Sequence, residues 1–338
     1  MPIWKETIAQ HQAPRLVHSS WQLVNTLIPY AALVSLMAWM ASRAWWMTLP
    51  LAVPAGALLV RIFVLFHDCA HGSFFRSSRA NRFWGILLGV LTFTPFSEWR
   101  YTHVLHHATA GDLDRRGTGD IWTLTVQEYL EASRWKRFAY RVTRNPFVLF
   151  VVAPLVVFLG EYRFARRGAA KRERRSVYWT NAGIVAIATA ASLTVGFKIY
   201  VFVQVPILMV AGTVGVWLFY VQHQFDGVYW KRGKDWDFVT AALEGSSFYA
   251  LPGLLQWFTG SIGFHHVHHL SPAIPNYNLE KCHRELPMFE TVKTLTLLSS
   301  LKSLTFRLWD EQRGKLVSYR RLREIRRANT ARVSTSSP

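Results

Sequence analysis

The 338-residue sequence has only two cysteines, Cys69 and Cys282, which form no C-x-x-C pair and no disulfide framework. We therefore expect its active side to face a reducing, cytoplasmic compartment. The sequence also lacks a G-x-G-x-x-G fingerprint, a P-loop, cluster-binding cysteines, a fused haem module and an internal repeat. Any redox chemistry must then take its electrons from an external protein carrier.

The sequence contains several long apolar runs with almost no charged residues. Hydrophobic residues make up 51% of the chain, and the runs 24–41 and 45–66 have about the 20 residues that a membrane-spanning helix needs. Two later runs, 177–196 and 199–220, have similar lengths. The first run begins too far from Met1, and lacks a small-residue cleavage site, to be a signal peptide. The sequence therefore predicts an all-α integral membrane protein with four transmembrane helices.

The distribution of charge predicts how these four helices are arranged. We expect two hairpins, with turns at 41–44 and 196–200, and two shorter apolar segments, 83–97 and 145–160, that lie at the membrane interface. If 145–160 crossed, it would carry the seven basic residues of 161–175 to the outside, against the positive-inside rule. The predicted unit is a single domain over 1–327. The tail 328–338 is predicted to be disordered because it is rich in Ser and Thr.

Acidic residues are scarce: 39 Lys and Arg stand against 20 Asp and Glu, which gives a formal net charge of +19. The segments 131–145, 161–175 and 302–332 are rich in basic residues. A basic run can bind nucleic acid, but beside membrane-spanning helices it is explained more simply by attachment to anionic lipid. We expect anionic membrane lipid, and no nucleic acid, as a partner.

Histidine is concentrated where the apolar runs end. The motifs HDCAH, HVLHH and HHVHH each place two or three imidazoles on one face of a helix, because residues three and four apart share a face. One tetrahedral metal ion takes about four ligands, so nine imidazoles imply two ions; iron, copper, zinc and nickel all accept imidazole. The candidate metal ligands and catalytic residues are His67, His71, His103, His106, His107, His223, His265, His268 and His269.

The remaining histidines and the nearby carboxylates are assigned other roles. On a helix His266 points about 100° away from His265, His283 is a candidate neighbour of the ligands, and His11 and His18 are expected to be exposed. Cys69 is expected to be a packing residue. Metal-bound imidazoles usually donate their free N–H to an acceptor such as a carboxylate. The candidate acceptors, unless they are solvated or paired with Arg100, Arg115 or Arg116, are Asp68, Glu98, Asp112, Asp114, Asp120, Asp226 and Glu244.

Four stretches carry a family resemblance over about 20–290: HDCAHGSFF (67–75), HVLHHATAGDLDRRGTGD (103–120), YVQHQFD (220–226) and GFHHVHHLSPAIPNY (263–277). They resemble the membrane fatty acid desaturases, particularly the bacterial branch that is similar to omega-6 (delta-12) acyl-lipid desaturases. The resemblance implies a cytosolic helical cap, holding a non-haem di-iron site, over the four helices. It assigns the eight box histidines as ligands and His223 as the extra histidine after the last span. Relatives of the animal stearoyl type have an asparagine four residues before that histidine, where this chain has Phe219.

The same resemblance implies a reaction, cofactors and partners. The expected reaction is the O₂-dependent insertion of a cis double bond into an acyl chain on lipid, coenzyme A or acyl carrier protein, of the delta-12/omega-6 type. The implied cofactors are two iron ions, with O₂ as co-substrate. A ferredoxin-type protein is the expected electron donor, and cytochrome b5 is the other candidate. The expected location is the bacterial inner membrane, with the active site on the cytoplasmic side.

Other functions share parts of this pattern. A hydroxylase, ketolase or conjugase acting on an alkyl, sterol or carotenoid substrate would use the same boxes, because hydroxylation and desaturation share the first hydrogen abstraction. A metal transporter would need ionisable residues near the middle of its spans, and a haem-carrying subunit would need axial ligands on facing helices. Here the histidines lie beyond the ends of the apolar runs, which disfavours a non-catalytic metal protein.

Overall fold

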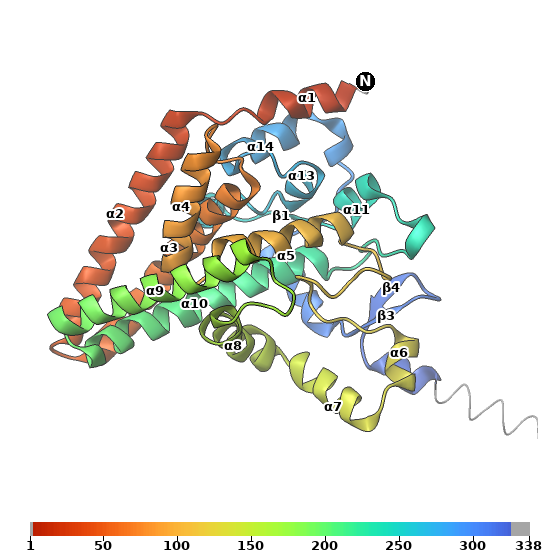
Figure 1. Cartoon of the computed structure of the whole chain (residues 1–338). Coiled ribbons are helices and arrows are strands. Elements are labelled where there is room, and N and C mark those ends of the chain that lie inside the picture. The colour runs from red at the N-terminus through yellow and green to blue at the C-terminus, as the bar shows by residue number, and fades with distance from the viewer. Residues whose placement is uncertain (1–2, 326–338) are drawn as a thin grey trace, which may run out of the picture.

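Helices make up most of the described chain, residues 3–325, in this computed structural model (Figure 1). The predicted disordered tail 328–338 lies outside the described residues. Two small sheets complete the fold, one parallel and one antiparallel. The strands are β1, Phe248–Tyr249, which pairs with β2, Thr294–Leu295, and β3, Leu308–Asp310, which pairs with β4, Lys315–Val317. The fold is therefore mostly helical, as the sequence predicts.

Three helices are long and apolar enough to cross a membrane. They are α2, Leu16–Ala41; α3, Thr48–His71, preceded by the short helix η1, Trp45–Met47; and α10, Phe197–His223. They contain the predicted runs 24–41, 45–66 and 199–220. Each helix is longer than its run because the polar residues that flank the run remain helical, which places the histidines of α3 and α10 in their last turns.

The predicted run 177–196 lies in α9, Lys171–Thr194, which runs beside α10 (Figure 1). This helix is not one of the three with spanning character. Its first two turns are basic and Asn181 lies in its third turn, so its apolar part is shorter than that of α10.

The region predicted to lie at the interface, 145–160, forms a bent helical segment. The helix α7, Arg134–Thr143, and the segment Val148–Arg163 together have spanning length and composition, but they meet at an angle of 67°. Counting this pair as one broken span would raise the number of candidate spans from three to four.

The helix α3 lies at the centre of the helical bundle. It packs against α2, α10 and α4, Ser78–Leu91, and most of its side chains are buried. At Gly56 an added Cβ would lie 2.5 Å from Cγ1 of Val210 on α10. Glycine therefore allows a close approach of α3 and α10, as small residues do between membrane helices. This contact holds two of the histidine-bearing helices together.

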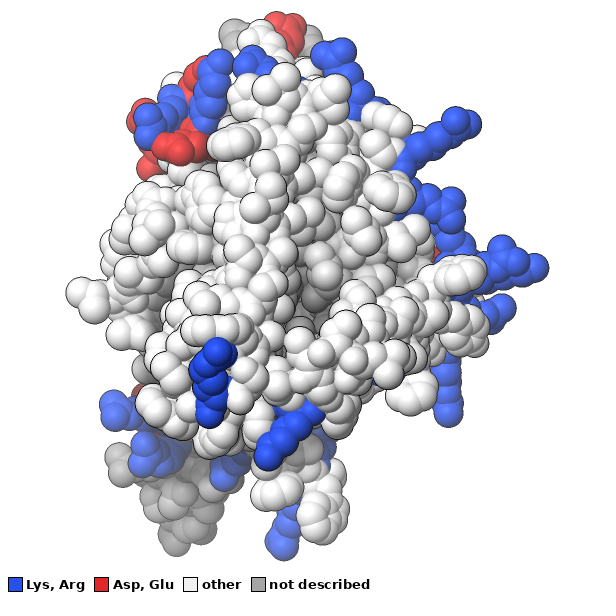
Figure 2. Space-filling view, turned by 90° about the vertical axis from the view of Figure 1, so that its left-hand side faces the viewer, with Lys and Arg blue, Asp and Glu red and all other residues white. Residues whose placement is uncertain are grey.

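One broad face of the molecule is almost free of charge. Figure 2 shows this face, where α2 and the connected ends of α9 and α10 lie, with a hollow near its middle. Large apolar side chains are exposed on these helices, among them Trp39 at 57%, Trp179 at 70% and Leu193 at 83%. An exposed apolar surface of this size indicates contact with a membrane.

The remaining helices are shorter. Their bounds are α1, Ile3–His11; α5, Phe96–Thr109; α6, Val126–Glu131; η2, Val148–Val152; α8, Ala153–Leu159; η3, Glu161–Arg163; η4, Gly233–Asp235; α11, Phe238–Glu244; α12, Gly253–Phe258; α13, His265–Leu270; α14, Asn276–Glu285; η5, Pro287–Phe289; α15, Leu297–Ser300; and η6, Leu301–Thr305.

The first helix corrects one expectation. His11 was expected to be exposed, but it is 5% exposed, and its Nε2 lies 2.7 Å from Oε2 of Glu285. The reason is that α1 folds back onto α14, a contact between residues more than 250 positions apart in sequence. His18 is exposed, as predicted.

Candidate metal centre

Four helices bring all nine predicted histidines into one place. The last turns of α3 carry His67 and His71, and α10 ends at His223. The two short helices α5 and α13 carry the remaining six, with the spacing of each motif preserved on a helix. Because every motif is helical, the predicted ligands of each motif reach the centre together, whereas His266 of the third motif points away from it.

The first group contains five histidines: His67, His71, His103, His107 and His268. One ligand nitrogen of each lies within 4.8 Å of those of the others. Nε2 of His107 lies 3.1 Å from Nε2 of His103 and 3.0 Å from Nε2 of His268. This group could hold one metal ion.

The second group is built around His106, His223 and His269, whose ligand nitrogens also lie within 4.8 Å of one another. His265 adjoins them, with its Nε2 3.0 Å from Nε2 of His223 and 3.1 Å from Nε2 of His269. Nε2 of His106 lies 3.2 Å from Nε2 of His223. With His265 this group offers four imidazoles to a second ion.

The two H-x-x-H-H motifs divide their histidines between the groups. On α5 the i,i+4 pair His103 and His107 belongs to the first group, and His106 belongs to the second. On α13 the division is reversed: His265 and His269 join the second group, and His268 joins the first. Residues four apart lie almost directly above one another on a helix, whereas the third histidine is turned aside.

Hydrogen bonds fix the tautomers of two imidazoles in the second group. Nδ1 of His106 lies 2.6 Å from Oδ1 of Asp120, and Nδ1 of His223 lies 3.1 Å from the carbonyl oxygen of Gly245. Both oxygens accept hydrogen bonds, so each Nδ1 carries the proton and each Nε2 carries a lone pair. Two lone pairs that face each other at 3.2 Å repel unless a cation lies between them.

The spacing of the nitrogens also fits metal ligands. Two imidazole nitrogens bound to one ion at about 2.0–2.1 Å, roughly at right angles, lie about 3 Å apart. The closest Nε2 pairs in both groups lie 3.0–3.2 Å apart. In addition, Nδ1 of His67 and Nε2 of His71 are buried without a hydrogen-bond partner. The residues present therefore fit a bound metal.

Five histidines of the centre that lie outside the membrane-spanning helices favour the neutral form. Burial, and then the neighbouring imidazoles, lowers the pKa of each of these five well below the usual value. These five are His103, His107, His265, His268 and His269. Burial alone would raise the pKa of Asp120, but the hydrogen bond with His106 lowers it below its ordinary value. A carboxylate beside neutral imidazoles is the arrangement that metal binding requires.

Asp120 accepts a hydrogen bond from a histidine of the centre, as predicted, whereas Asp68 lies beside another without accepting one. Oδ1 of Asp68 lies 3.5 Å from Nδ1 of His67, and its Oδ2 accepts hydrogen bonds from the backbone and side-chain nitrogens of Asn276 at 2.7 and 2.9 Å. Asp68 thus ties the first motif to the segment that follows the third.

The other predicted carboxylates serve elsewhere. Glu98 pairs with Arg166, Asp112 with Arg115, Asp114 with Arg232, and Asp226 with Lys302. Glu244 makes no side-chain ion pair or hydrogen bond within residues 3–325. Of the three arginines expected as partners, Arg115 pairs with Asp112, whereas Arg116 pairs with Glu128.

Sequence reasoning missed the backbone carbonyl of Gly245 that holds His223. A Cβ at Gly245 would lie 2.4 Å from the carbonyl oxygen of Ala241, so this turn admits only glycine without a backbone shift. The one available signal was the glycine that directly follows the helix α11.

Three further side chains border the centre without joining it. His266 is fully buried, but its Nε2 lies 2.9 Å from Nδ1 of His283, away from both groups. Cys69 is 1% exposed and belongs to the apolar core, as expected for a packing residue. The ring of Phe219 lies 5.1 Å from that of His106 and 5.2 Å from that of His223. Phe219 therefore gives one side of the second group an apolar cover.

Comparison with known proteins gives consistent matches. A sequence profile described as "Fatty acid desaturase" matches residues 44–293. The chain is 49% identical over 318 residues to a "Fatty acid desaturase" of Bacillus subtilis, covering 94% of this chain and 90% of that protein. An "sn-1 oleoyl-lipid 12-desaturase" of Picosynechococcus is 27% identical over 283 residues, covering 79% and 76%. An "sn-1 acyl-lipid omega-3 desaturase (ferredoxin)" of Synechocystis is 26% identical over 272 residues, covering 75% and 69%.

Proposed function

The chain belongs to the fatty acid desaturase family, and from this premise we propose that its nine clustered histidines hold two iron ions that serve O₂-dependent acyl desaturation. Membership of the family makes the protein an oxidoreductase. The observation that carries the proposal is the convergence of nine imidazoles from four helices into two adjacent groups. Opposed lone pairs on His106 and His223 support a cation between them.

The proposed ligands are the five histidines of the first group and the four of the second. They are His67, His71, His103, His107 and His268, and His106, His223, His265 and His269. When bound, iron with O₂ supplies the oxidising power to remove hydrogen atoms from unactivated methylenes. O₂ is reduced to two waters by two hydrogen atoms of the acyl chain together with two electrons and two protons. The hydrogen bonds to Asp120 and to the carbonyl of Gly245 would keep a proton on Nδ1 of His106 and of His223. Each Nε2 is then free to bind the metal.

The proposed substrate is a mono-unsaturated acyl chain on a membrane lipid or carrier, and the proposed product carries a delta-12/omega-6 double bond. The name of the Picosynechococcus relative supports this position. The name of the Synechocystis relative supports a ferredoxin-type electron donor. A basic protein with a net charge of +19 would attract an acidic carrier electrostatically.

The reaction is tested by expression in a bacterial host that makes no polyunsaturated lipid. Mass spectrometry of the lipid extract should locate a new cis double bond on the methyl side of the existing bond in a C18 chain. A bond at the ninth carbon of a saturated chain would preserve the enzyme class and reject the omega-6 proposal. A hydroxylated product alone would reject desaturation.

We also propose four membrane spans, in two hairpins, with the histidines in a cap on the cytoplasmic side of the bacterial inner membrane. The basic first turns of α9 support this orientation, because 171–175 then remains on the positive side. In this arrangement α9 is the third span and the segment 145–160 stays at the interface. The apolar face in Figure 2 would then contact lipid.

This orientation predicts which introduced cysteines react with an impermeant reagent added to intact cells. Thr118→Cys and Arg167→Cys should be protected, whereas Arg43→Cys and Lys198→Cys should be labelled. All four positions are exposed, and the first two avoid the neighbouring Gly117 and Gly168, whose positive φ disfavours a side chain.

Cys69 and Cys282 are buried, so the parent protein should give little background labelling. Labelling of all four variants after the cells are permeabilised is the control for reactivity. External labelling at Arg167→Cys would mean that 145–160 crosses the membrane, and the four-span arrangement would then be wrong.

A further inference from the structure

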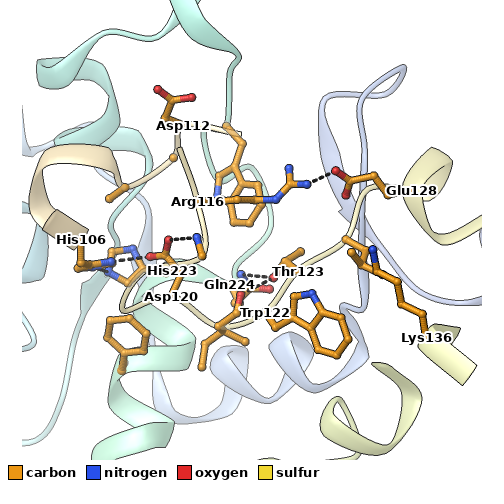
Figure 3. Close-up of a pocket in the computed structure, with 17 residues that line it drawn as sticks. His106, Asp112, Arg116, Asp120, Trp122, Thr123, Glu128, Lys136, His223 and Gln224 are labelled. Carbon is orange, nitrogen blue, oxygen red and sulfur yellow. Dashed lines mark hydrogen bonds and ion pairs between the residues drawn. The ribbon is translucent and has the colours of Figure 1, made fainter. Parts of the chain in front are cut away.

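A cavity of about 290 Å³ lies beside the second histidine group. Its walls come from α5, the loop 110–125, α6, α7 and α10. Figure 3 shows His106 and His223 on one side of the cavity, and Arg116, Glu128 and Lys136 on the other. The exposed Lys136 marks its outer end. The cavity thus connects the metal centre with the surface.

The carboxylates in the wall of the cavity are already engaged. Asp120 accepts a hydrogen bond from His106 at 2.6 Å. Glu128 pairs with Arg116 and accepts a hydrogen bond from the backbone nitrogen of Thr125 at 2.8 Å. Asp112 pairs with Arg115, which does not line the cavity. None of the three carboxylates is therefore left to neutralise a further cation.

The basic groups in the wall are not fully engaged. Nη1 of Arg116 is buried and has no hydrogen-bond partner. Lys136 makes no ion pair within the described residues 3–325. A buried donor without a partner costs stability unless water or a ligand satisfies it. The outer part of the cavity therefore offers an anion the free Nη1 of Arg116, whose Nη2 pairs with Glu128, and the ammonium group of Lys136.

The wall between these donors and the histidines combines apolar and polar side chains. Ile121, Trp122, Phe219 and Trp230 are its large apolar members, and Asp120, Thr123 and Gln224 are its polar members (Figure 3). The apolar members can contact hydrocarbon, and the ring of Phe219 lies against His106 and His223. The cavity combines two basic side chains at its outer end, apolar surface and the candidate metal centre.

We infer that this cavity admits the acyl substrate and that Arg116 and Lys136 bind a phosphate ester in its polar head. The inference rests on the proposed function and adds the recognition of the head group. The carboxyl of an acyl ester or thioester carries no charge, so the anion that the substrate brings is its phosphate. A guanidinium fork and an ammonium group are the side chains that bind phosphate best. A membrane phospholipid and coenzyme A both offer this chemistry.

The test compares the iron-loaded parent enzyme with the double variant Arg116→Gln/Lys136→Gln in lipid nanodiscs. The substrates are oleoyl phosphatidylglycerol, oleoyl-coenzyme A and an oleoyl galactolipid that has no phosphate. For the phosphate-bearing substrate that the parent uses, KM should rise about tenfold or more, the effect of losing charge-assisted hydrogen bonds. The kcat should change less than about twofold, and turnover of the galactolipid should be unaffected. The substrate that responds identifies the source of the phosphate.

A single variant serves as the matched control. Arg134→Gln removes an exposed charge from the same helix as Lys136, and Arg134 does not line the cavity. It should keep the KM of the parent enzyme. Equal changes for phosphate-bearing and galactolipid substrates, or no change for either, would overturn the inference.

Direct binding separates this inference from the proposed function. Titration with dioctanoyl phosphatidylglycerol and with coenzyme A should give saturable binding of at least one of them to the parent protein, weakened about tenfold or more in the double variant. If the parent turns over no substrate, the proposed function fails, and this titration still decides the phosphate site. Equal binding to parent and variant would reject the site even in an active enzyme.

Discussion

Replacing His107 with alanine is expected to abolish desaturation and to lower the iron content of the purified protein from about two ions per chain to about one or fewer. Nε2 of His107 lies 3.1 Å from that of His103 and 3.0 Å from that of His268, so its loss opens the first group at its centre. Loss of a hydrogen-bond partner of a metal ligand alone costs about 10–100-fold, and loss of a ligand should cost more. Metal analysis and lipid analysis of the same preparation measure both effects.

Two histidine controls accompany this variant. His18→Ala removes an exposed imidazole and should leave iron and activity unchanged. His266→Ala removes a buried imidazole that pairs with His283, so its effect should be milder than that of His107→Ala. The other box histidines and His223 should behave as His107 does. An active protein that holds one iron per chain, or zinc at full occupancy, would contradict the di-iron proposal.

The second large effect is expected from Asp120→Asn, which should lower iron affinity and activity by about 10–100-fold. Asp120 accepts a hydrogen bond from His106 through Oδ1, and one from the backbone nitrogen of Gly117 through Oδ2 at 3.1 Å. An asparagine has only one acceptor atom, so its NH₂ must face one of these two donors. If it faces His106, the proton moves to Nε2 and the lone pair for the metal is lost.

A chelator series followed by metal analysis measures the affinity of the Asp120→Asn variant. Asp114→Asn is the matched control, because Asp114 is exposed and pairs with Arg232 outside the centre. That control should retain iron like the parent protein. Equal iron retention in Asp120→Asn and the parent would show that the tautomer of His106 does not depend on this carboxylate.

Local geometry explains which parts of the centre were predictable. The spacing of each histidine motif places its imidazoles near one another on a helix, so the local clusters were predictable from the sequence. Their division into two groups depends on how α5 and α13 are rotated against α3 and α10, which no local pattern encodes. The carbonyl of Gly245 was missed for a different reason, since any residue has a carbonyl and only the fold brings this one to His223.

Hydropathy predicted three of the four expected spans as helices of spanning character. Runs 24–41, 45–66 and 199–220 lie within helices of spanning character because length and apolarity decide both. The run 177–196 has weaker spanning character, because α9 begins with a basic turn and continues through Asn181. His11 was placed wrongly because its burial depends on α14, whose approach to α1 is a long-range contact.

The interleaving of the two histidine groups has a consequence for how the enzyme is assembled in the cell. Both α5 and α13 carry histidines of each group, so if two ions bind as proposed, fixing either helix around one ion also positions nitrogens for the other. Binding of one ion should therefore raise the affinity for the other, which is a favourable coupling free energy between the two sites. Half-loaded protein should then be scarce. If the proposed ions are iron, iron shortage would lower the fraction of active molecules and leave the activity of each active molecule nearly constant.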